Sequence, residues 1–283
     1  MSWRDPVRRL FRDAVVACLS FQSQGMKRWE FRHFQRYILW VLFRLEKQEI
    51  VDTLVGPPDK RFRMRLRWRL HTGYVVGMYE PAVIRALRKY LRHGDTCVDV
   101  GGHIGYLTLL MASTVGPKGK VVTFEPMPDT YRVLEENVNL NGLKNVKLEQ
   151  TAVGESETTG SLVFEANQLL TWTPSASAYG VRGERKSVSV PVLSLDHYIR
   201  NAGLHPRLIK VDVEGAELDV LRGAQQLLRE DGPTVLVEVH GVGGNHERAV
   251  LTLLKECGYS THALEVRTGE AIYLALPDAG ERL

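Results

Sequence analysis

Apolar segments with strand character alternate with helical segments from Thr96 to the end of the chain, and this alternation constrains the fold most. The expected strands lie at 96–100, 121–124, 146–153, 208–211, 234–239, 259–264 and 271–276. Helical periodicity is found at 81–91, 104–112, 129–140, 217–228 and 246–257. Strands and helices in this succession form a parallel sheet with helices on both faces. The sequence therefore predicts an α/β domain whose ligands bind at the carboxyl ends of the strands.

The alternation is interrupted between 155 and 196. Segments 161–165 and 186–192 have strand character and flank a polar stretch that contains Trp172 and Tyr179. We expect a hairpin here. Its aromatic tip either stacks on a sugar or a flat polyketide, or is an ordinary surface turn.

The first third of the chain is basic, although the net charge of the whole chain is only +4. Residues 1–95 contain 20 Lys and Arg against 9 Asp and Glu, whereas the remainder contains 17 against 24. A basic segment of this kind favours contact with an anionic partner, or packs against the acidic remainder. Its apolar residues recur at helical spacing, at Phe31, Phe34, Ile38, Leu42 and Leu45. This amphipathic helix is expected to pack on the main domain, to form a homodimer contact, or to lie on a membrane surface.

The helical pattern ends at Gly56-Pro57-Pro58, and a strictly alternating segment follows at 61–70. Arginine occupies every second position there, so we expect a half-buried strand, alone or in a hairpin. No recognised nucleic-acid module surrounds the arginines, and the prediction is that nucleic acid is not a partner. The predicted domains are a basic helical N-terminal region at 1–58 and an α/β domain at 59–283.

Cysteine usage and hydropathy point to the cytoplasm. The three cysteines, Cys18, Cys97 and Cys257, are far apart and have no CxxC spacing, which argues against a disulfide framework or a zinc site. The longest apolar run, 37–43, is much shorter than the roughly 20 residues of a membrane-spanning helix. We therefore predict a cytoplasmic protein, with peripheral contact to the inner face of the membrane as an added option for its basic region.

The turn after the first strand of the α/β domain indicates the ligand. It has the pattern Asp99-x-Gly101-x-x-x-Gly105 in place of the G-x-G-x-x-G that binds a dinucleotide pyrophosphate. An acidic residue at this point suits an ammonium group, such as that of S-adenosylmethionine. Glu125, at the end of the next strand, is then placed to accept hydrogen bonds from ribose hydroxyls. The pattern favours the methyl donor over a nicotinamide cofactor, and a nicotinamide-dependent oxidoreductase is kept as an alternative.

Four segments together resemble the FkbM family of S-adenosylmethionine-dependent methyltransferases. They are Val98-Asp-Val-Gly-Gly-His-Ile-Gly-Tyr106, Phe124-Glu-Pro-Met-Pro128, Asn137-x-Asn139-x-Asn141 and Ile209-Lys-Val-Asp-Val-Glu-Gly-Ala-Glu217. The resemblance spans about residues 75–241. It implies a class I methyltransferase fold, Rossmann-like, with a seven-stranded sheet and bound S-adenosylmethionine. It also implies methyl transfer, usually to a hydroxyl of a saccharide or polyketide.

The resemblance also implies which residues hold the cofactor. Asp99, Gly101, Gly102 and Gly105 correspond to the methionine end, Glu125 to the ribose, and Thr151 and Ala152 to the adenine edge. Glu80, before the helix at 81–91, matches a family element and is a further candidate, although a carboxylate there also stabilises a helix N-terminus. The family commonly has Ala-Asn where this chain has Gly102-His103, which leaves a contact between His103 and the cofactor open.

Methyl transfer to a hydroxyl requires removal of its proton, because an aliphatic hydroxyl is a poor nucleophile at neutral pH. Asp212, Glu214, Glu238 and His240 follow or end two expected strands, and Asp212 with His240 is the favoured catalytic pair. One alternative has Asp212 and Glu238 hold Mg²⁺, and another has His240 act as a metal-free base. Glu217 is expected only to stabilise a helix N-terminus, and Lys210 to pair with a carboxylate.

The functional prediction is thus an O-methyltransferase that acts on a small-molecule or glycan acceptor. The alternative outside catalysis is a protein that binds S-adenosylmethionine, or a membrane-surface adaptor, without turnover.

Overall fold

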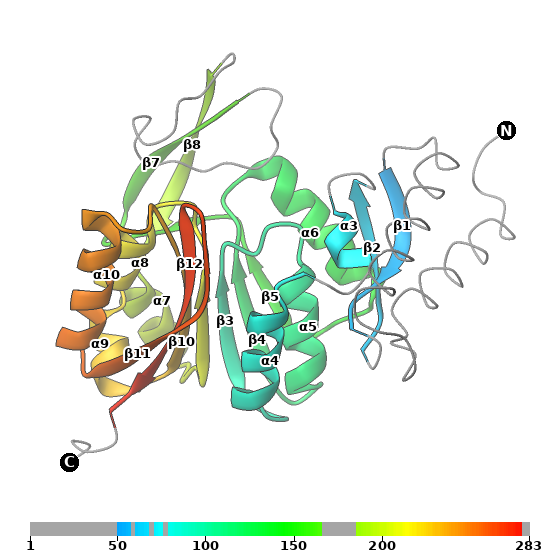
Figure 1. The fold of residues 1–283 in the computed structure, drawn as a ribbon. Helices are drawn as coiled ribbons and strands as arrows, with labels where there is room; N and C mark the ends of the chain where they lie inside the picture. Colours follow the sequence, from blue (N-terminus) through cyan, green and yellow to red (C-terminus); the bar gives the residue numbers. More distant parts are fainter. Residues whose placement is uncertain (1–49, 58–59, 68–70, 76–78, 166–184, 279–283) are drawn as a thin grey trace, which may run out of the picture. The chain divides into compact units, whose positions relative to one another are not determined.

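The computed structural model describes residues 50–57, 60–67, 71–75, 79–165 and 185–278 (Figure 1). The chain divides into two compact units, which are Met1–Pro81 with Glu136–Gly142, and Ala82–Glu135 with Leu143–Leu283. The domain boundary expected after residue 58 stays a prediction. Among the described residues, no helix combines the length and the hydropathy that crossing a membrane requires.

The first unit contains an antiparallel hairpin and a short helix. Strand β1, Ile50–Val55, pairs with β2, Phe62–Arg67, and α3 follows at Thr72–Val75. Every second residue of both strands is buried, which confirms the half-buried strand expected at 61–70 over the range of β2. The expectation of a helical region up to residue 58 is wrong for β1. The expected stripe from Phe31 to Leu45 lies outside the described residues.

Two asparagines of the Asn-rich motif hold the second strand of this hairpin. The Asn137 side chain accepts the Arg65 N–H at 2.6 Å and donates to the Arg65 carbonyl at 3.1 Å. Asn141 does the same for Arg63, at 2.9 and 2.7 Å. The Arg65 guanidinium binds Asp52 and Glu136, each at 2.9 Å. The charge of this arginine is therefore paired with carboxylates of the same unit.

The second unit is built on a seven-stranded sheet of order β11-β12-β10-β9-β3-β4-β5. Its strands are β3 Thr96–Val100, β4 Lys120–Phe124, β5 Val146–Glu149, β9 Leu208–Val211, β10 Thr234–His240, β11 Tyr259–Arg267 and β12 Glu270–Pro277. β12 runs antiparallel to both neighbours, and the other pairs between adjacent strands are parallel. The predicted α/β fold with a seven-stranded, mostly parallel sheet is confirmed.

A smaller three-stranded sheet of order β6-β8-β7 accompanies the main sheet. Its strands are β6 Ala152–Val153, β7 Thr158–Glu165 and β8 Arg185–Leu193. β7 and β8 form the expected hairpin, whose tip with Trp172 and Tyr179 lies outside the described residues. The single strand expected at 146–153 is two strands in different sheets, because β5 pairs with β4 whereas β6 pairs with β8.

Helices lie on both sides of the main sheet in Figure 1. They are α4 Pro81–Tyr90, α5 Tyr106–Val115, α6 Pro128–Leu140, α7 Leu195–Ala202, α8 Glu217–Arg222, α9 Gln225–Glu230 and α10 Asn245–Glu256. Apolar residues of α7 to α10 pack with alternate residues of the central strands, such as Val100, Val211 and Val237. The opposite set of alternate residues, which includes Asp99 and Lys210, faces α5.

Candidate functional site

The turn between β3 and α5 is fixed by backbone contacts that only glycine permits. Gly101 and Gly105 have φ angles of 84° and 98°. The amides of Gly101 and Gly102 both donate to the Phe124 carbonyl at 3.0 Å. A Cβ atom on Gly101 would lie 1.8 Å from the Asp212 carbonyl oxygen. The sequence therefore needs glycine here to bring the turn against the ends of β4 and β9.

Glu125, directly after β4, is oriented by the same turn. Its two carboxylate oxygens accept the backbone N–H groups of His103 at 2.9 Å and Met127 at 3.0 Å. Burial raises the pKa of Glu125 to about 7, although both backbone hydrogen bonds oppose this. A carboxylate has about four lone-pair sites, so each oxygen keeps one for a further donor. This arrangement fits the two hydroxyls of a ribose, and the assignment of Glu125 to the ribose stays a prediction.

Asp99, on β3 before the turn, has a side chain with no exposed surface. The Thr108 hydroxyl donates to one oxygen at 2.6 Å, and the Lys210 Nζ lies 3.5 Å from the other. Burial raises the pKa of Asp99, and Lys210 opposes this. Asp99 is thus held beneath the turn by Thr108 and Lys210, and its role at the methionine end of the cofactor stays a prediction.

Lys210 joins the glycine turn to the next strand. It is the register partner of Asp99 across the parallel pair of β3 and β9, so both side chains point to the same face. Its Nζ donates to the Gly101 carbonyl at 3.0 Å and lies 3.2 Å from an Asp212 carboxylate oxygen. The expectation that Lys210 pairs with a carboxylate is confirmed.

The structure brings the expected catalytic residues together at the carboxyl edge of β9 and β10. These two strands are parallel neighbours, as the sequence required for Asp212 and Glu238 to share one edge. Ligand-capable atoms of Asp212, Glu214 and His240 lie within 4.8 Å of one another. Ligand-capable atoms of Glu238, His240 and Glu270 also lie within 4.8 Å of one another, and so do carboxylate oxygens of Asp212 and Glu238. The predicted Mg²⁺ ligands Asp212 and Glu238 are thus close enough to share an ion, and metal binding stays a prediction.

His240 lies between two carboxylates at this edge. Its Nδ1 is 2.8 Å from Glu217 Oε1, and its Nε2 is 3.3 Å from Glu214 Oε2. Burial would lower the pKa of His240, but the hydrogen bond to Glu217 and the charge of Glu214 outweigh it and raise this pKa to about 9. Partial burial and the charge of Asp212 raise the pKa of Glu214 to about 7. The two carboxylates therefore favour the protonated form of His240.

Glu217 begins α8 and is completely buried. It accepts hydrogen bonds from the Gly215 N–H at 2.8 Å, from His240 and, at 2.7 Å, from His246. Burial alone would raise the pKa of Glu217, yet the hydrogen bonds from the two histidines lower it to about 2. Its expected role as a simple helix N-terminal carboxylate is therefore incomplete. The signal that could have revealed this is its place on the apolar stripe of α8, one turn before Val220 and Leu221.

The remaining cofactor candidates are placed as follows. The Thr151 hydroxyl donates to the Pro191 carbonyl at 2.8 Å, and Ala152 begins β6 and is buried. Gly102 is closely packed, since a Cβ there would lie 2.2 Å from Thr123. Glu80 belongs to the first unit, is 5% exposed and has a φ angle of 40°. The cofactor roles of these residues stay predictions.

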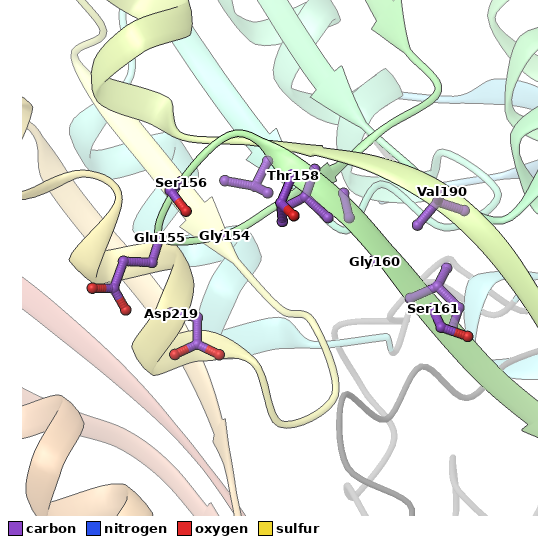
Figure 2. A pocket seen from close by; sticks show the side chains of 12 residues that line it. Gly154, Glu155, Ser156, Thr158, Gly160, Ser161, Val190 and Asp219 are labelled. Atoms are coloured by element: carbon purple, nitrogen blue, oxygen red, sulfur yellow. The ribbon is translucent and has the colours of Figure 1, made fainter.

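A hollow of about 300 Å³ lies beside β6, β7 and β8 (Figure 2). Its apolar part comes from Ala152, Leu162 and Val190, which form a small core cluster. Its polar part comes from serine and threonine hydroxyls and two carboxylates, namely Ser156, Thr158, Ser161, Glu155 and Asp219. Figure 2 shows Glu155 and Asp219 at one end of the hollow and Ser161 and Val190 at the other. Such a surface can pack against an apolar face and accept hydrogen bonds from hydroxyls.

The sheet order with one antiparallel strand, the glycine turn after β3 and the acidic residue after β4 define an S-adenosylmethionine-dependent methyltransferase of class I. The match to a family model narrows this class. The model for the methyltransferase FkbM domain covers residues 99–261, more than half of the chain, and the chain belongs to this family.

Relatives with curated names agree with this assignment. The hexuronic acid methyltransferase AglP of Haloferax volcanii is 31% identical over 193 residues, which are 68% of this chain and 74% of the relative. The 31-O-demethyl-FK506 methyltransferase FkbM of Streptomyces tacrolimicus is 27% identical over 208 residues, which are 62% and 79% of the two chains. A crystal structure of methyltransferase FkbM from Methylobacillus flagellatus has a TM-score of 0.46 at 16% identity, and the alignment covers 95% of this chain and 60% of that one.

Proposed function

We propose that this methyltransferase transfers the methyl group to a hydroxyl oxygen of a saccharide or polyketide acceptor. The observation that carries the proposal is the cluster of Asp212, Glu214 and His240 at the edge that also holds the glycine turn. The names of two relatives, one for a hexuronic acid and one for 31-O-demethyl-FK506, support this acceptor class. The family assignment favours this enzyme over the nicotinamide-dependent oxidoreductase and over a non-catalytic adaptor.

The cofactor residues fit S-adenosylmethionine on two grounds. The left-handed glycines let the backbone approach a ligand closely, and Glu125 keeps lone pairs for two ribose hydroxyls. When bound, S-adenosylmethionine supplies an electrophilic methyl carbon and leaves as a neutral thioether. Gly101, Gly102, Gly105 and the Thr151-Ala152 segment complete the proposed binding surface.

The chain must orient the acceptor hydroxyl and take its proton. We assign the proton to the Asp212 carboxylate, which is 19% exposed and is held by Lys210. His240 lies beside Asp212 and Glu214, and its charge opposes the rise that burial causes in the pKa of Glu214. Loss of the Asp212 charge should therefore slow the chemical step more than it weakens cofactor binding. In the metal-dependent alternative, Asp212 and Glu238 hold a divalent ion that lowers the pKa of the hydroxyl.

The direct test is turnover of candidate acceptors by the native protein. Saccharides, hexuronates and polyketides would be incubated with S-adenosylmethionine, and mass spectrometry would detect S-adenosylhomocysteine and a methylated acceptor. Asp212→Asn and His240→Gln should each lower kcat by about 10²-fold or more, with little change in cofactor affinity. Loss of activity in EDTA and recovery with Mg²⁺ would assign Asp212 and Glu238 to metal binding. Full turnover by both variants would place the base elsewhere, with His103 the next candidate.

The hollow beside β7 is proposed to hold the part of the acceptor that does not react. Thr158 lines it, whereas Thr159 is also exposed on the same strand and is not part of the lining. Thr158→Trp should raise the acceptor KM without changing the Kd of S-adenosylmethionine, and Thr159→Trp should change neither. A weaker cofactor Kd in Thr158→Trp would instead assign the hollow to the cofactor.

Three further predictions concern location and partners. The cytoplasmic location rests on cysteine usage, and peripheral membrane contact and a homodimer rest on the basic amphipathic segment. That segment lies outside the described residues. Sedimentation of the full chain would test the dimer.

A further inference from the structure

Glu217 is a buried carboxylate that the reaction scheme above does not use. It shares the inward face of α8 with Val220 and Leu221, and its own side chain has no exposed surface. A carboxylate in such surroundings is destabilising unless donors satisfy its oxygens. The structure supplies three donors, and the two from side chains are His240 and His246.

The hydrogen bond to Glu217 determines which way the His240 ring faces. A carboxylate only accepts hydrogen bonds, so the His240 nitrogen next to it, Nδ1, must carry the hydrogen. The opposite nitrogen, Nε2, then points to Glu214 Oε2 at 3.3 Å and joins the cluster with Asp212. His240 is the last residue of β10, and of its two ring contacts the one with Glu217 is the shorter, 2.8 Å against 3.3 Å. Its orientation therefore depends on Glu217.

His246 holds Glu217 from the other side. Its Nε2 lies 2.7 Å from Glu217 Oε2, while His240 uses Oε1. The two oxygens thus have different partners on different elements, β10 and the first turn of α10. With both oxygens engaged, the carboxylate plane is fixed, and so is the direction in which it presents its lone pairs to His240.

We propose that Glu217 is a positioning residue that holds His240 with its Nε2 toward the reacting hydroxyl. The inference rests on the proposed function where it assigns His240 to that hydroxyl. A buried carboxylate that orients an imidazole in this way has a large effect on the chemical step in other enzymes, because it fixes the ring and its hydrogens.

The test combines kinetics with NMR of the histidine side chains in the full chain. Glu217→Gln keeps the shape but removes the charge, so kcat should fall by about 10²-fold or more while the Kd of S-adenosylmethionine changes less than about twofold. In ¹⁵N-labelled native protein, His240 should show an Nδ1–H resonance that is protected from exchange with water. The resonance should move upfield in Glu217→Gln, because the acceptor loses its charge.

Asp231→Asn is the matched control. Asp231 also accepts from a histidine, with 3.0 Å between its Oδ2 and His205 Nδ1, but His205 is 84% exposed. This variant should leave kcat and the His240 resonance unchanged. An unchanged kcat in folded Glu217→Gln, or a native His240 without a hydrogen on Nδ1, would overturn the proposal.

The NMR measurement distinguishes a failure of the proposed positioning role from a failure of the proposed function. If Glu217→Gln does not fold, the native NMR spectrum alone decides, because absence of the protected Nδ1–H resonance contradicts the assigned orientation. If the native protein methylates no acceptor, the proposed function fails, and the NMR measurement still supports or overturns the role of Glu217.

Discussion

Replacement of Lys210 by methionine should destabilise the fold strongly. Lys210 is 7% exposed, and its Nζ lies 3.5 Å from an oxygen of Asp99, which is completely buried. At an effective dielectric constant of about 20, two charges at that distance attract by about 5 kcal/mol. Removal of one partner from a buried pair typically lowers the free energy of unfolding by about 3–5 kcal/mol. We expect a loss in this range for Lys210→Met near pH 8.

The loss should depend on pH, and its sign follows from Asp99. Burial already raises the pKa of Asp99 in the folded protein, and removal of Lys210 raises it further. Folded Lys210→Met then keeps a proton on Asp99 that the unfolded chain releases above about pH 4. The two folded proteins differ in bound protons only between their two raised Asp99 pKa values, so the stability of the variant relative to the native protein should fall as the pH rises through the native Asp99 pKa toward pH 8. Urea unfolding followed by circular dichroism at pH 5 and pH 8 measures this difference.

Two further variants make the test specific. Asp99→Asn in the Lys210→Met background removes the carboxyl group that must stay protonated in the folded variant, and should recover most of the loss at pH 8. Lys147→Met is the surface control, because its Nζ lies 2.9 Å from Glu149 but its side chain is 63% exposed, so it should lose less than about 1 kcal/mol. The reasoning is refuted if Lys210→Met loses no more than Lys147→Met, or if the double variant is no more stable than Lys210→Met alone.

The remaining predictions concern the cofactor site and the N-terminal segment. Glu125→Gln should weaken S-adenosylmethionine binding by about 1.5–3 kcal/mol in isothermal titration calorimetry, because a charged acceptor is lost. Since burial raises the pKa of Glu125 to about 7, the stability advantage of the native protein over Glu125→Gln should shrink as the pH rises from about 4 to 7 in urea unfolding. Gly101→Ala should lose about 2–5 kcal/mol, whereas Gly142→Ala, with a φ angle of 61° and open space around it, should lose only about 1–2 kcal/mol. A chain that begins at Ile50 should keep its affinity for S-adenosylmethionine and lose binding to anionic vesicles, and equal vesicle binding by both chains would contradict the membrane prediction.

The central sheet could be predicted closely because its strands are apolar runs that end at polar or glycine-rich turns. β3 and β9 have the expected bounds, and β4 begins one residue earlier than expected. β1 was missed because it directly follows a segment with helical spacing, although its buried residues, Val51, Thr53 and Val55, already alternate in the sequence. An alternation this short can be seen in the sequence, but only the pairing with β2 in the structure shows that it forms a strand.

The break between α8 and α9 could not be predicted from local pattern alone. Apolar residues continue at helical spacing through 217–228, so one helix was expected. In the fold, a Cβ on Gly223 would lie 2.0 Å from the Gly154 carbonyl oxygen, and the helix is interrupted where that segment crosses. This contact joins residues about 70 positions apart in sequence, and the spacing of apolar residues within a helix carries no information about it.

In the candidate site, too, the sequence did not indicate the contacts between distant residues, here those of two buried carboxylates. Strand order placed Asp212 and His240 at one edge, but two completely buried carboxylates organise that edge, Asp99 from strand β3 and Glu217 from helix α8. Asp99 acts through Lys210, whose Nζ also reaches Asp212, and Glu217 acts through His240. Lys210 lies on β9, two residues before Asp212, and Asp212 approaches His240 of the neighbouring strand β10. Asp212 and His240 at the edge are thus held in place by contacts that lead to two buried carboxylates. The residue types at the strand ends therefore indicated the chemistry of the site. They did not indicate Asp99 and Glu217, which fix its geometry.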